Sequence, residues 1–139
     1  MSNVKLSVVT VTYNAENLVE DTIKSVIEQD FSDMEYIVID GKSTDRTLDI
    51  INHYASCIQT IVSEPDRGIF DAMNKALRFV KGEWVYFLNA GDLFASSNVL
   101  KSIPWKDLDN KIAFYGDMIY VRGSNEKFSQ SRPVSFLHE

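Results

Sequence analysis

Residues 6–12 read LSVVTVT, a short stretch that is rich in β-branched residues and shows no steady alternation of polar and apolar side chains. A strand that is buried on both faces of a parallel sheet has this composition, because neither of its faces has to meet water. The stretch therefore predicts a central strand.

The segments that follow alternate between helical and extended patterns. From Glu16 to Gln29 the apolar residues Val19, Ile23, Val26 and Ile27 fall on one stripe of a helix. Further helices are predicted at 44–54 and 69–80, and further buried strands at 35–39, 58–62 and 84–88. Such an alternation predicts right-handed crossovers and an α/β fold, a doubly wound, mostly parallel sheet with helices on both faces.

Cap residues predict where the second and third of these helices begin and end. Ser43 or Thr44 is expected to cap the helix at 44–54, and Asp45 favours its positively polarised first turn. Gly82 is the expected C-terminal cap of the helix at 69–80. The residues of that helix expected in the core are Ile69, Met73, Ala76, Leu77 and Val80.

Beyond residue 90 the pattern is weaker. Strands are predicted at 112–115 and 118–121, and the tail from Gly123 is polar. We expect a main domain over residues 1–122 and a tail at 123–139.

The length, charge and cysteine content of the chain exclude several classes of protein. The chain has 139 residues, of which 45% are hydrophobic, and a formal net charge of −6. This length suits one domain that folds without disulfides, and the acidic balance without a Lys/Arg run disfavours nucleic-acid binding. Cys57, the single cysteine, cannot form a zinc site with the distant His53 and His138 and is expected to be buried as a small hydrophobe.

Apolar runs are short. The longest, Trp84–Leu88, is far below the roughly 20 residues that a membrane-spanning helix needs, and no small-residue cleavage site of a signal peptide follows the first strand. We therefore expect a cytoplasmic domain without a transmembrane segment, with peripheral attachment to the inner face of a membrane through other regions left open.

Polar side chains gather after the predicted strands, at the edge where α/β sheets bind ligands. The turn after the first strand, Tyr13–Glu16, has no glycine, which disfavours a dinucleotide-binding enzyme, and the P-loop pattern is absent. A receiver domain would need an acidic pair after the first strand, an Asp after the third and a Lys after the fifth. This chain has Tyr13-Asn14, Ser63-Glu64 and Gly116-Asp117 there.

Five segments stand in a fixed order between about residues 5 and 122: SVVTVTYNAEN, VIDGKSTDRTLDII, SEPDRGIFDAMNKAL, KGEWVYFLNAGDLF and FYGDMIY. Together they resemble the family 2 inverting glycosyltransferases of the GT-A fold, nearest to bacterial enzymes that assemble capsular, colanic-acid-like or other surface polysaccharides. The resemblance implies that residues 1–122 form the domain for a nucleotide-sugar donor and that 123–139 begin an acceptor-side segment.

The resemblance also implies roles at the ends of the first two strands. Thr12 and Asn14, with Tyr13 between them, match the motif that lines the base and ribose. Asp40 matches an Asp that hydrogen-bonds the uracil or ribose, since a carboxylate accepts hydrogen bonds from an imide N–H or from hydroxyls. Many relatives have a second Asp where this chain has Gly41.

Residues 63–80 match the segment that closes over the nucleotide and donor sugar. Gly68 and Asn74 fit the family pattern. Arg67 either contacts the diphosphate or is a solvated charge, and Asp71 either contacts the donor's sugar or ribose or favours the first helical turn. Lys75 is expected to be an exposed helix residue.

Residues 89–92 stand where the family carries its D-x-D metal motif, and of its carboxylates only Asp92 remains. A leaving nucleoside diphosphate needs charge neutralisation, which Mg²⁺ or Mn²⁺ supplies when one carboxylate, phosphates and water hold it. Asp117 either orients acceptor or donor or is a turn carboxylate, and the family's general base is expected further along than residue 139.

These features predict a glycosyltransferase that moves a sugar with inversion from a nucleoside diphosphate donor, a UDP-sugar, to a hydroxyl of a glycan or lipid-linked glycan. The alternative is a catalytically incomplete nucleotide-sugar-binding module that lacks its general base. A receiver-like signalling domain is the third and weakest interpretation.

Overall fold

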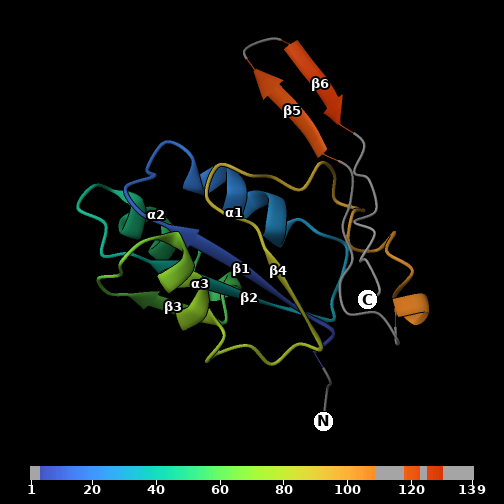
Figure 1. Ribbon diagram of the computed structural model, residues 1–139, viewed down its shortest axis with the longest axis horizontal. Coiled ribbons are helices and arrows are strands. Elements are labelled where there is room, and N and C mark those ends of the chain that lie inside the picture. Colours follow the sequence, from blue (N-terminus) through green and yellow to red (C-terminus); the bar gives the residue numbers. More distant parts are fainter. Residues whose placement is uncertain (1–3, 109–117, 123–124, 130–139) are drawn as a thin grey trace, which may run out of the picture. The chain divides into compact units, whose positions relative to one another are not determined.

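The computed structural model describes residues 4–108, 118–122 and 125–129. The chain divides into two compact units, Met1–Ser102 and Ile103–Glu139, each of which is described by itself. The first unit contains a four-stranded sheet with three α-helices (Figure 1).

Strand β1 (Leu6–Thr12) lies in the interior of this sheet. It pairs with β2 (Met34–Asp40) on one edge and with β4 (Trp84–Phe87) on the other, and β3 (Thr60–Ser63) pairs with β2. The strand order is β3-β2-β1-β4, and every one of these pairings is parallel. All seven residues of β1 are buried, which confirms the predicted central strand.

Three helices connect the strands. Helix α1 (Val19–Ile27) follows β1, α2 (Thr47–His53) follows β2, and α3 (Ile69–Ala76) follows β3. The first two connections step outward from β1, whereas the third returns past β1 to β4. Right-handed crossovers therefore place α3 on the opposite face of the sheet from α1 and α2, as the doubly wound α/β class predicts.

Side chains from alternate positions of β1 and β2 form the core beneath α3. Their isopropyl and sec-butyl groups pack against two alanines, which keep the helix close to the sheet. This cluster consists of Val9, Val11, Ile37, Ile39, Ala72 and Ala76.

Helix α3 is shorter than predicted, and part of its predicted core stripe is wrong. It ends at Ala76 with Leu77 as the C-cap. Ala76 is buried as predicted, but Ile69 and Leu77 are 46% and 52% exposed. The helical spacing of apolar residues continues in the sequence beyond the end of the helix. Against the sheet, the small residue Ala72 packs where larger residues were expected.

Gly82 does not cap α3, because that helix ends several residues earlier. A Cβ atom at Gly82 would lie 2.5 Å from the backbone nitrogen of Ser7 and 2.8 Å from the carbonyl carbon of Leu6. The Gly82 N–H donates to Ser7 Oγ (2.8 Å), and the Ser7 hydroxyl donates to the buried carboxylate of Glu35 (2.6 Å). Glycine is required because the chain passes directly over β1 before it enters β4.

Two other local predictions were wrong. Cys57 is exposed, because it lies in η1 (Ala55–Cys57), a single 3-10 turn that buries none of its residues. Helix α2 has no side-chain cap from Ser43 or Thr44. Asp45 instead accepts the backbone N–H of Thr47 (2.9 Å), the first residue of α2.

The second unit contains η2 (Trp105–Leu108) and an antiparallel hairpin of β5 (Met118–Arg122) and β6 (Asn125–Ser129). Strand β5 confirms the prediction at 118–121, whereas β6 lies in the tail that showed no clear pattern. The strand predicted at 112–115 lies outside the described residues, and the boundary after residue 122 stays a prediction. No helix in the described ranges is long and apolar enough to cross a membrane.

Replacing Gly82 by Ala is expected to lower the free energy of unfolding by about 1–3 kcal/mol, because the new methyl group meets backbone atoms of β1 that cannot move aside. Urea unfolding measures this loss. The neighbouring Lys81→Ala, at an exposed position, is the control and should stay within about 0.5 kcal/mol of the parent. Equal stability of Gly82→Ala and the parent would contradict the close approach.

Candidate functional site

The carboxyl ends of the four strands meet at one edge of the sheet. The register pairs Thr12 with Asp40 and Asp40 with Ser63. Beyond β4, the N–H of Ala90 donates to the carbonyl of Val11 (3.2 Å), which brings residues 89–92 to the end of β1. The parallel pairing therefore gathers the predicted site residues of β1, β2 and the loop after β4 at one edge.

Asp40 is completely buried and organises two loops. Its Oδ2 atom accepts hydrogen bonds from the N–H of Ser43 (2.9 Å) and the hydroxyl of Ser63 (2.6 Å), and its Oδ1 atom accepts the hydroxyl of Ser43. Three donors from the protein thus surround this carboxylate. Sequence reasoning named Ser43 only as a helix-cap candidate and Ser63 only as a strand end, and it did not predict either serine as a partner of Asp40.

Asn14 joins the loop after β1 to the loop after β2. Its side-chain oxygen accepts the N–H of Thr44 (2.8 Å), and its own N–H donates to Ser43 Oγ (2.9 Å). Its φ of 45° lies in the left-handed region, which Asn tolerates better than most residues. The next residue continues the connection, since the Ala15 N–H donates to Thr47 Oγ1 (2.8 Å).

Tyr13 presents its ring at the same edge and is 61% exposed. A Cβ atom built on Gly41 would lie 3.4 Å from Tyr13 Cδ2 and 2.7 Å from Asp66 Oδ2, so ring and carboxylate flank one small space. In the preceding residue, Thr12, the Oγ1 atom is buried and has no hydrogen-bond partner among the described residues. An exposed aromatic face next to polar groups suits the stacking of a flat ring.

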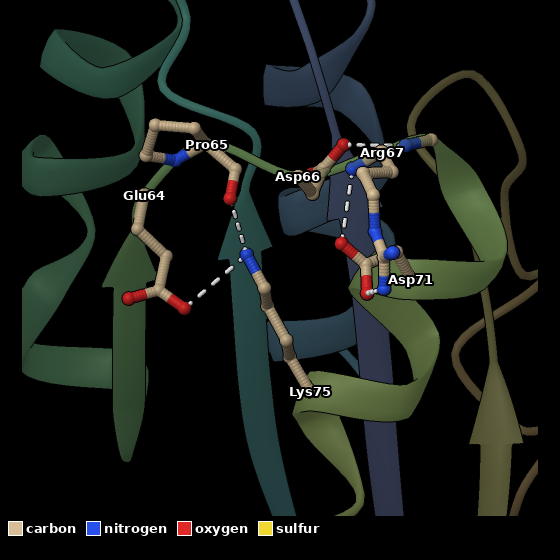
Figure 2. A network of polar contacts seen from close by, with 7 residues as sticks. Glu64, Pro65, Asp66, Arg67, Asp71 and Lys75 are labelled. Carbon is tan, nitrogen blue, oxygen red and sulfur yellow. Dashed lines mark hydrogen bonds and ion pairs between the residues drawn. The ribbon is translucent and has the colours of Figure 1, made fainter.

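Lys75 is not the exposed helix residue that was expected. Its side chain is 14% exposed, and its Nζ atom donates to the carbonyl of Pro65 (2.5 Å) and pairs with Glu64 Oε1 (3.2 Å). Figure 2 shows this side chain reaching from α3 to the loop that precedes it. Lys75 therefore anchors residues 64 and 65 to the helix.

Asp71 and Arg67 form a second connection between this loop and α3 (Figure 2). Asp71 Oδ2 accepts the backbone N–H of Arg67 (2.9 Å), and the exposed guanidinium lies 3.7 Å from Asp71 Oδ1. The backbone hydrogen bond, aided by the charge of Arg67, lowers the pKa of the Asp71 carboxyl. Asp71 thus holds the start of the helix, and Asn74 is exposed one turn further along.

Asp66 shapes the turn between these two connections. Its Oδ1 atom accepts the N–H of Gly68 (2.9 Å), the residue before α3. Gly68 has a φ of 120°, which a residue with a side chain rarely adopts.

Residues 89–92 form a tight turn. The Asp92 N–H donates to the carbonyl of Asn89 (2.9 Å), and Gly91 has the positive φ, 100°, that the third position of a type II turn requires. The Asp92 side chain is exposed, whereas Asn89 Oδ1 is buried with no hydrogen-bond partner in the described part of the chain. Burial raises the pKa of Tyr86, and the nearby charge of Asp92 raises it further.

Two side chains of α1, with Gln29 just after it, hold this turn and the loop that follows. Thr22 Oγ1 accepts the N–H of Gly91 (2.9 Å), Ser25 Oγ accepts that of Phe94 (3.2 Å), and Gln29 Oε1 accepts that of Leu100 (3.1 Å). Sequence reasoning missed these three residues. Their spacing on one helical face was the available signal.

Oxygen donors at this turn fit a divalent cation that binds together with a phosphate ligand. Within residues 4–108, 118–122 and 125–129, no group of three or more His, Cys, Asp or Glu side chains is arranged to hold a metal ion. Asp92 and the unpartnered Asn89 Oδ1 provide one carboxylate and one amide oxygen, and Mg²⁺ or Mn²⁺ commonly completes such a set with phosphates and water. Asp117 lies outside the described residues.

Residues 7–138 match the sequence model of Glycosyl transferase family 2. The chain belongs to this family. The match spans the sheet, the loops at its carboxyl edge and the turn at 89–92, so the predicted family is confirmed. The likeness to solved glycosyltransferase structures given below confirms the predicted GT-A-like fold.

Curated relatives of this family 2 chain are bacterial glycosyltransferases. The chain is 36% identical over 103 residues to the teichuronic acid biosynthesis glycosyltransferase TuaG of Bacillus subtilis, covering 72% of this chain and 41% of TuaG. It is 29% identical over 127 residues to the Escherichia coli UDP-Glc:alpha-D-GlcNAc-diphosphoundecaprenol beta-1,3-glucosyltransferase WfgD, covering 90% of this chain and 50% of WfgD. The chain thus spans about half the length of these relatives.

Solved structures of similar proteins contain donors. The mannosyltransferase PcManGT of Pyrobaculum calidifontis, in complex with GDP-Man and Mn²⁺, has a TM-score of 0.65 at 32% identity over 69% of this chain and 30% of its own. Residues 1–349 of S. aureus TarS, in complex with UDP-GlcNAc, have a TM-score of 0.65 at 31% identity over 70% of this chain and 29% of that one.

Lys75→Met is expected to release the loop at 64–68, because the methionine keeps an apolar stem but cannot donate to Pro65 or pair with Glu64. Hydrogen exchange should show faster exchange of the loop amides with no change in β1. Arg78→Met, at an exposed position just after α3, is the control. Unchanged protection of the loop in Lys75→Met would refute the anchoring role.

Asp71→Asn is expected to lower stability near neutral pH. The folded-state pKa of Asp71 is lowered, so its contribution is complete above the usual carboxyl value of about 3.9 and is lost as pH falls through the lower folded value. Urea unfolding near neutral pH and at about pH 2 should therefore show a difference from the parent that disappears in acid. Asp49→Asn, on the exposed side of α2, is the control, and an equal difference at both pH values would contradict this.

Proposed function

We propose that this chain binds a nucleoside diphosphate sugar, a UDP-sugar, at the carboxyl edge of its sheet and takes part in inverting transfer of the sugar to a glycan or lipid-linked glycan hydroxyl. The acceptor belongs to bacterial surface polysaccharide biosynthesis in this proposal, as the names of TuaG and WfgD indicate for those relatives. The observation that carries the proposal is the exposed Tyr13 ring, which lies among polar loops where all four strands end.

The donor's base and ribose are assigned to the loops after β1 and β2. Tyr13 offers a face for the base, and the preceding residue, Thr12, offers a buried Oγ1 atom that no described residue hydrogen-bonds. Asn14 and Asp40 belong to the site as residues that hold these loops in place through Ser43 and Thr44.

The donor's diphosphate and sugar are assigned to the start of α3 and the turn at 89–92. The Arg67 side chain is 91% exposed, so its guanidinium can turn from Asp71 to a phosphate, and Gly68 lets the backbone approach closely. Asp71 and Asn74, which lie further along α3, are assigned to the donor sugar. Fixed groups of this kind act by positioning the donor and stabilising the charge of the leaving group.

Asp92 and Asn89 Oδ1 are the groups that would hold Mg²⁺ or Mn²⁺ with the diphosphate oxygens. Such an ion supplies Lewis-acid stabilisation of the leaving nucleoside diphosphate when bound. The turn that carries both residues is held in shape by Thr22 and by Gly91, so their spacing is set before any ligand arrives. A role for Asp117 toward donor or acceptor remains part of the proposal, as does the predicted cytoplasmic location.

Calorimetry with UDP tests the donor and metal assignments together. The parent chain should bind UDP more tightly with Mn²⁺ than without it, and Asp92→Asn should lose about tenfold or more of the Mn²⁺-dependent affinity. Asp33→Asn, just before β2 and away from the carboxyl edge, should bind as the parent does. Full retention of Mn²⁺-dependent binding in Asp92→Asn would overturn the metal assignment, and a transfer assay then separates a transferase from a module that only binds the donor.

A further inference from the structure

Asp40 and Asp66 are two carboxylates at the carboxyl edge of the sheet, and they differ in whether a ligand can reach them. Asp40 is completely buried, and three hydrogen bonds from Ser43 and Ser63 surround it. A ligand would have to break this arrangement to reach it. Asp40 therefore acts through the loops that it orders.

Asp66 is only half-buried, and one of its oxygens is available. Its Oδ1 atom accepts the Gly68 N–H (2.9 Å), while no hydrogen bond from the described residues reaches Oδ2. The Oδ2 atom lies 2.7 Å from the point that a Cβ at Gly41 would occupy, and Tyr13 Cδ2 lies 3.4 Å from that point. The absence of a side chain at Gly41 thus makes room for the Asp66 carboxylate beside the Tyr13 ring.

We propose that Asp66 is the residue that selects the base of the donor nucleotide, with its Oδ2 atom accepting a ring N–H of a base stacked on Tyr13. This inference rests on the proposed function and deepens it. The carboxylate comes from the loop after β3 and occupies the space that a side chain after β2 would otherwise fill.

The chemistry follows from hydrogen-bonding complementarity. An ionised carboxylate only accepts hydrogen bonds. Uracil and guanine each carry a ring N–H on the base-pairing edge, whereas cytosine carries an unprotonated acceptor nitrogen in the matching position. Asp66 therefore favours UDP or GDP and disfavours CDP, because a carboxylate facing an acceptor nitrogen leaves both without a partner.

Several contacts hold Asp66 in this position. The Gly68 N–H orients the carboxylate, and Lys75 ties the preceding residues, Glu64 and Pro65, to α3 (Figure 2). The Glu64 N–H also donates to the carbonyl of Asp40 (3.0 Å), which ties the loop to the end of β2.

Asp66→Asn gives a directional test. The Gly68 N–H still requires an acceptor, so the amide oxygen stays at the Oδ1 position and the NH₂ group replaces Oδ2. The NH₂ group, a hydrogen-bond donor, then faces the base. It repels a ring N–H of uracil or guanine but donates to the acceptor nitrogen of cytosine. We expect the ratio of UDP to CDP affinity to fall by about tenfold or more, the value of a hydrogen bond to a charged group.

The measurement is calorimetric titration of the chain with UDP, GDP and CDP at a fixed Mn²⁺ concentration. Asp49→Asn makes the same change of charge on the exposed side of α2 and should leave the affinity ratio unchanged. Asp66→Ala should lose the preference against CDP without gaining affinity for it, and Gly41→Ala should weaken UDP binding by displacing Asp66 while every charge is kept. Thermal unfolding of each variant confirms that it is folded.

The outcomes separate this inference from the proposed function. If the parent binds none of the three nucleotides, the proposed function fails. If the parent binds UDP or GDP but Asp66→Asn and Asp66→Ala keep its preference over CDP, the function stands and the role of Asp66 is refuted. A parent that prefers CDP, or an Asp49→Asn variant that loses the preference as Asp66→Asn does, also refutes it.

Discussion

Strand β1 forms hydrogen bonds along both edges and is buried along its whole length, and the rest of the first unit depends on this. Both neighbours run parallel to it, so each connection must cross a face of the sheet and return to the same starting end. All loops that follow the strands therefore gather at one edge. That edge is where the polar groups of the proposed donor site lie, since the strand itself offers no exposed surface.

The loops at this edge are ordered mainly by hydrogen bonds between one another. Asp40 binds Ser43 and Ser63, and Asn14 binds Thr44 across the gap between the first two loops. Burying a carboxylate costs free energy of folding unless hydrogen-bond donors surround it, so Asp40 depends on all of its donors together. Lys75 likewise anchors the loop before α3 to that helix, so hydrogen bonds and an ion pair within the protein order the loops of the proposed site.

Sequence reasoning predicted the strand at 6–12 to the residue and the presence of the three α-helices in the described part of the first unit, because buried strands and amphipathic helices have different apolar periods. It failed at Ile69 and Leu77, since periodicity does not show where a helix stops. It also failed at Lys75, whose partners lie ten and eleven residues earlier and meet it only through the bend of the chain. It failed at Gly82 as well, which was predicted as a helix cap, because its neighbour Ser7 is far away in sequence.

The sequence by itself determined the order of strands and helices, the family and the polar residues that follow each strand, because these depend on local composition and on motifs that are continuous in the chain. Only the tertiary structure decided which polar groups are available to a ligand. Asp40 and Asp66 are both carboxylates near a strand end, yet one is enclosed by donors and the other lies beside Tyr13 in the space left at Gly41. That difference arises from contacts between loops distant in sequence, and burial and hydrogen bonding exist only once those loops are folded together.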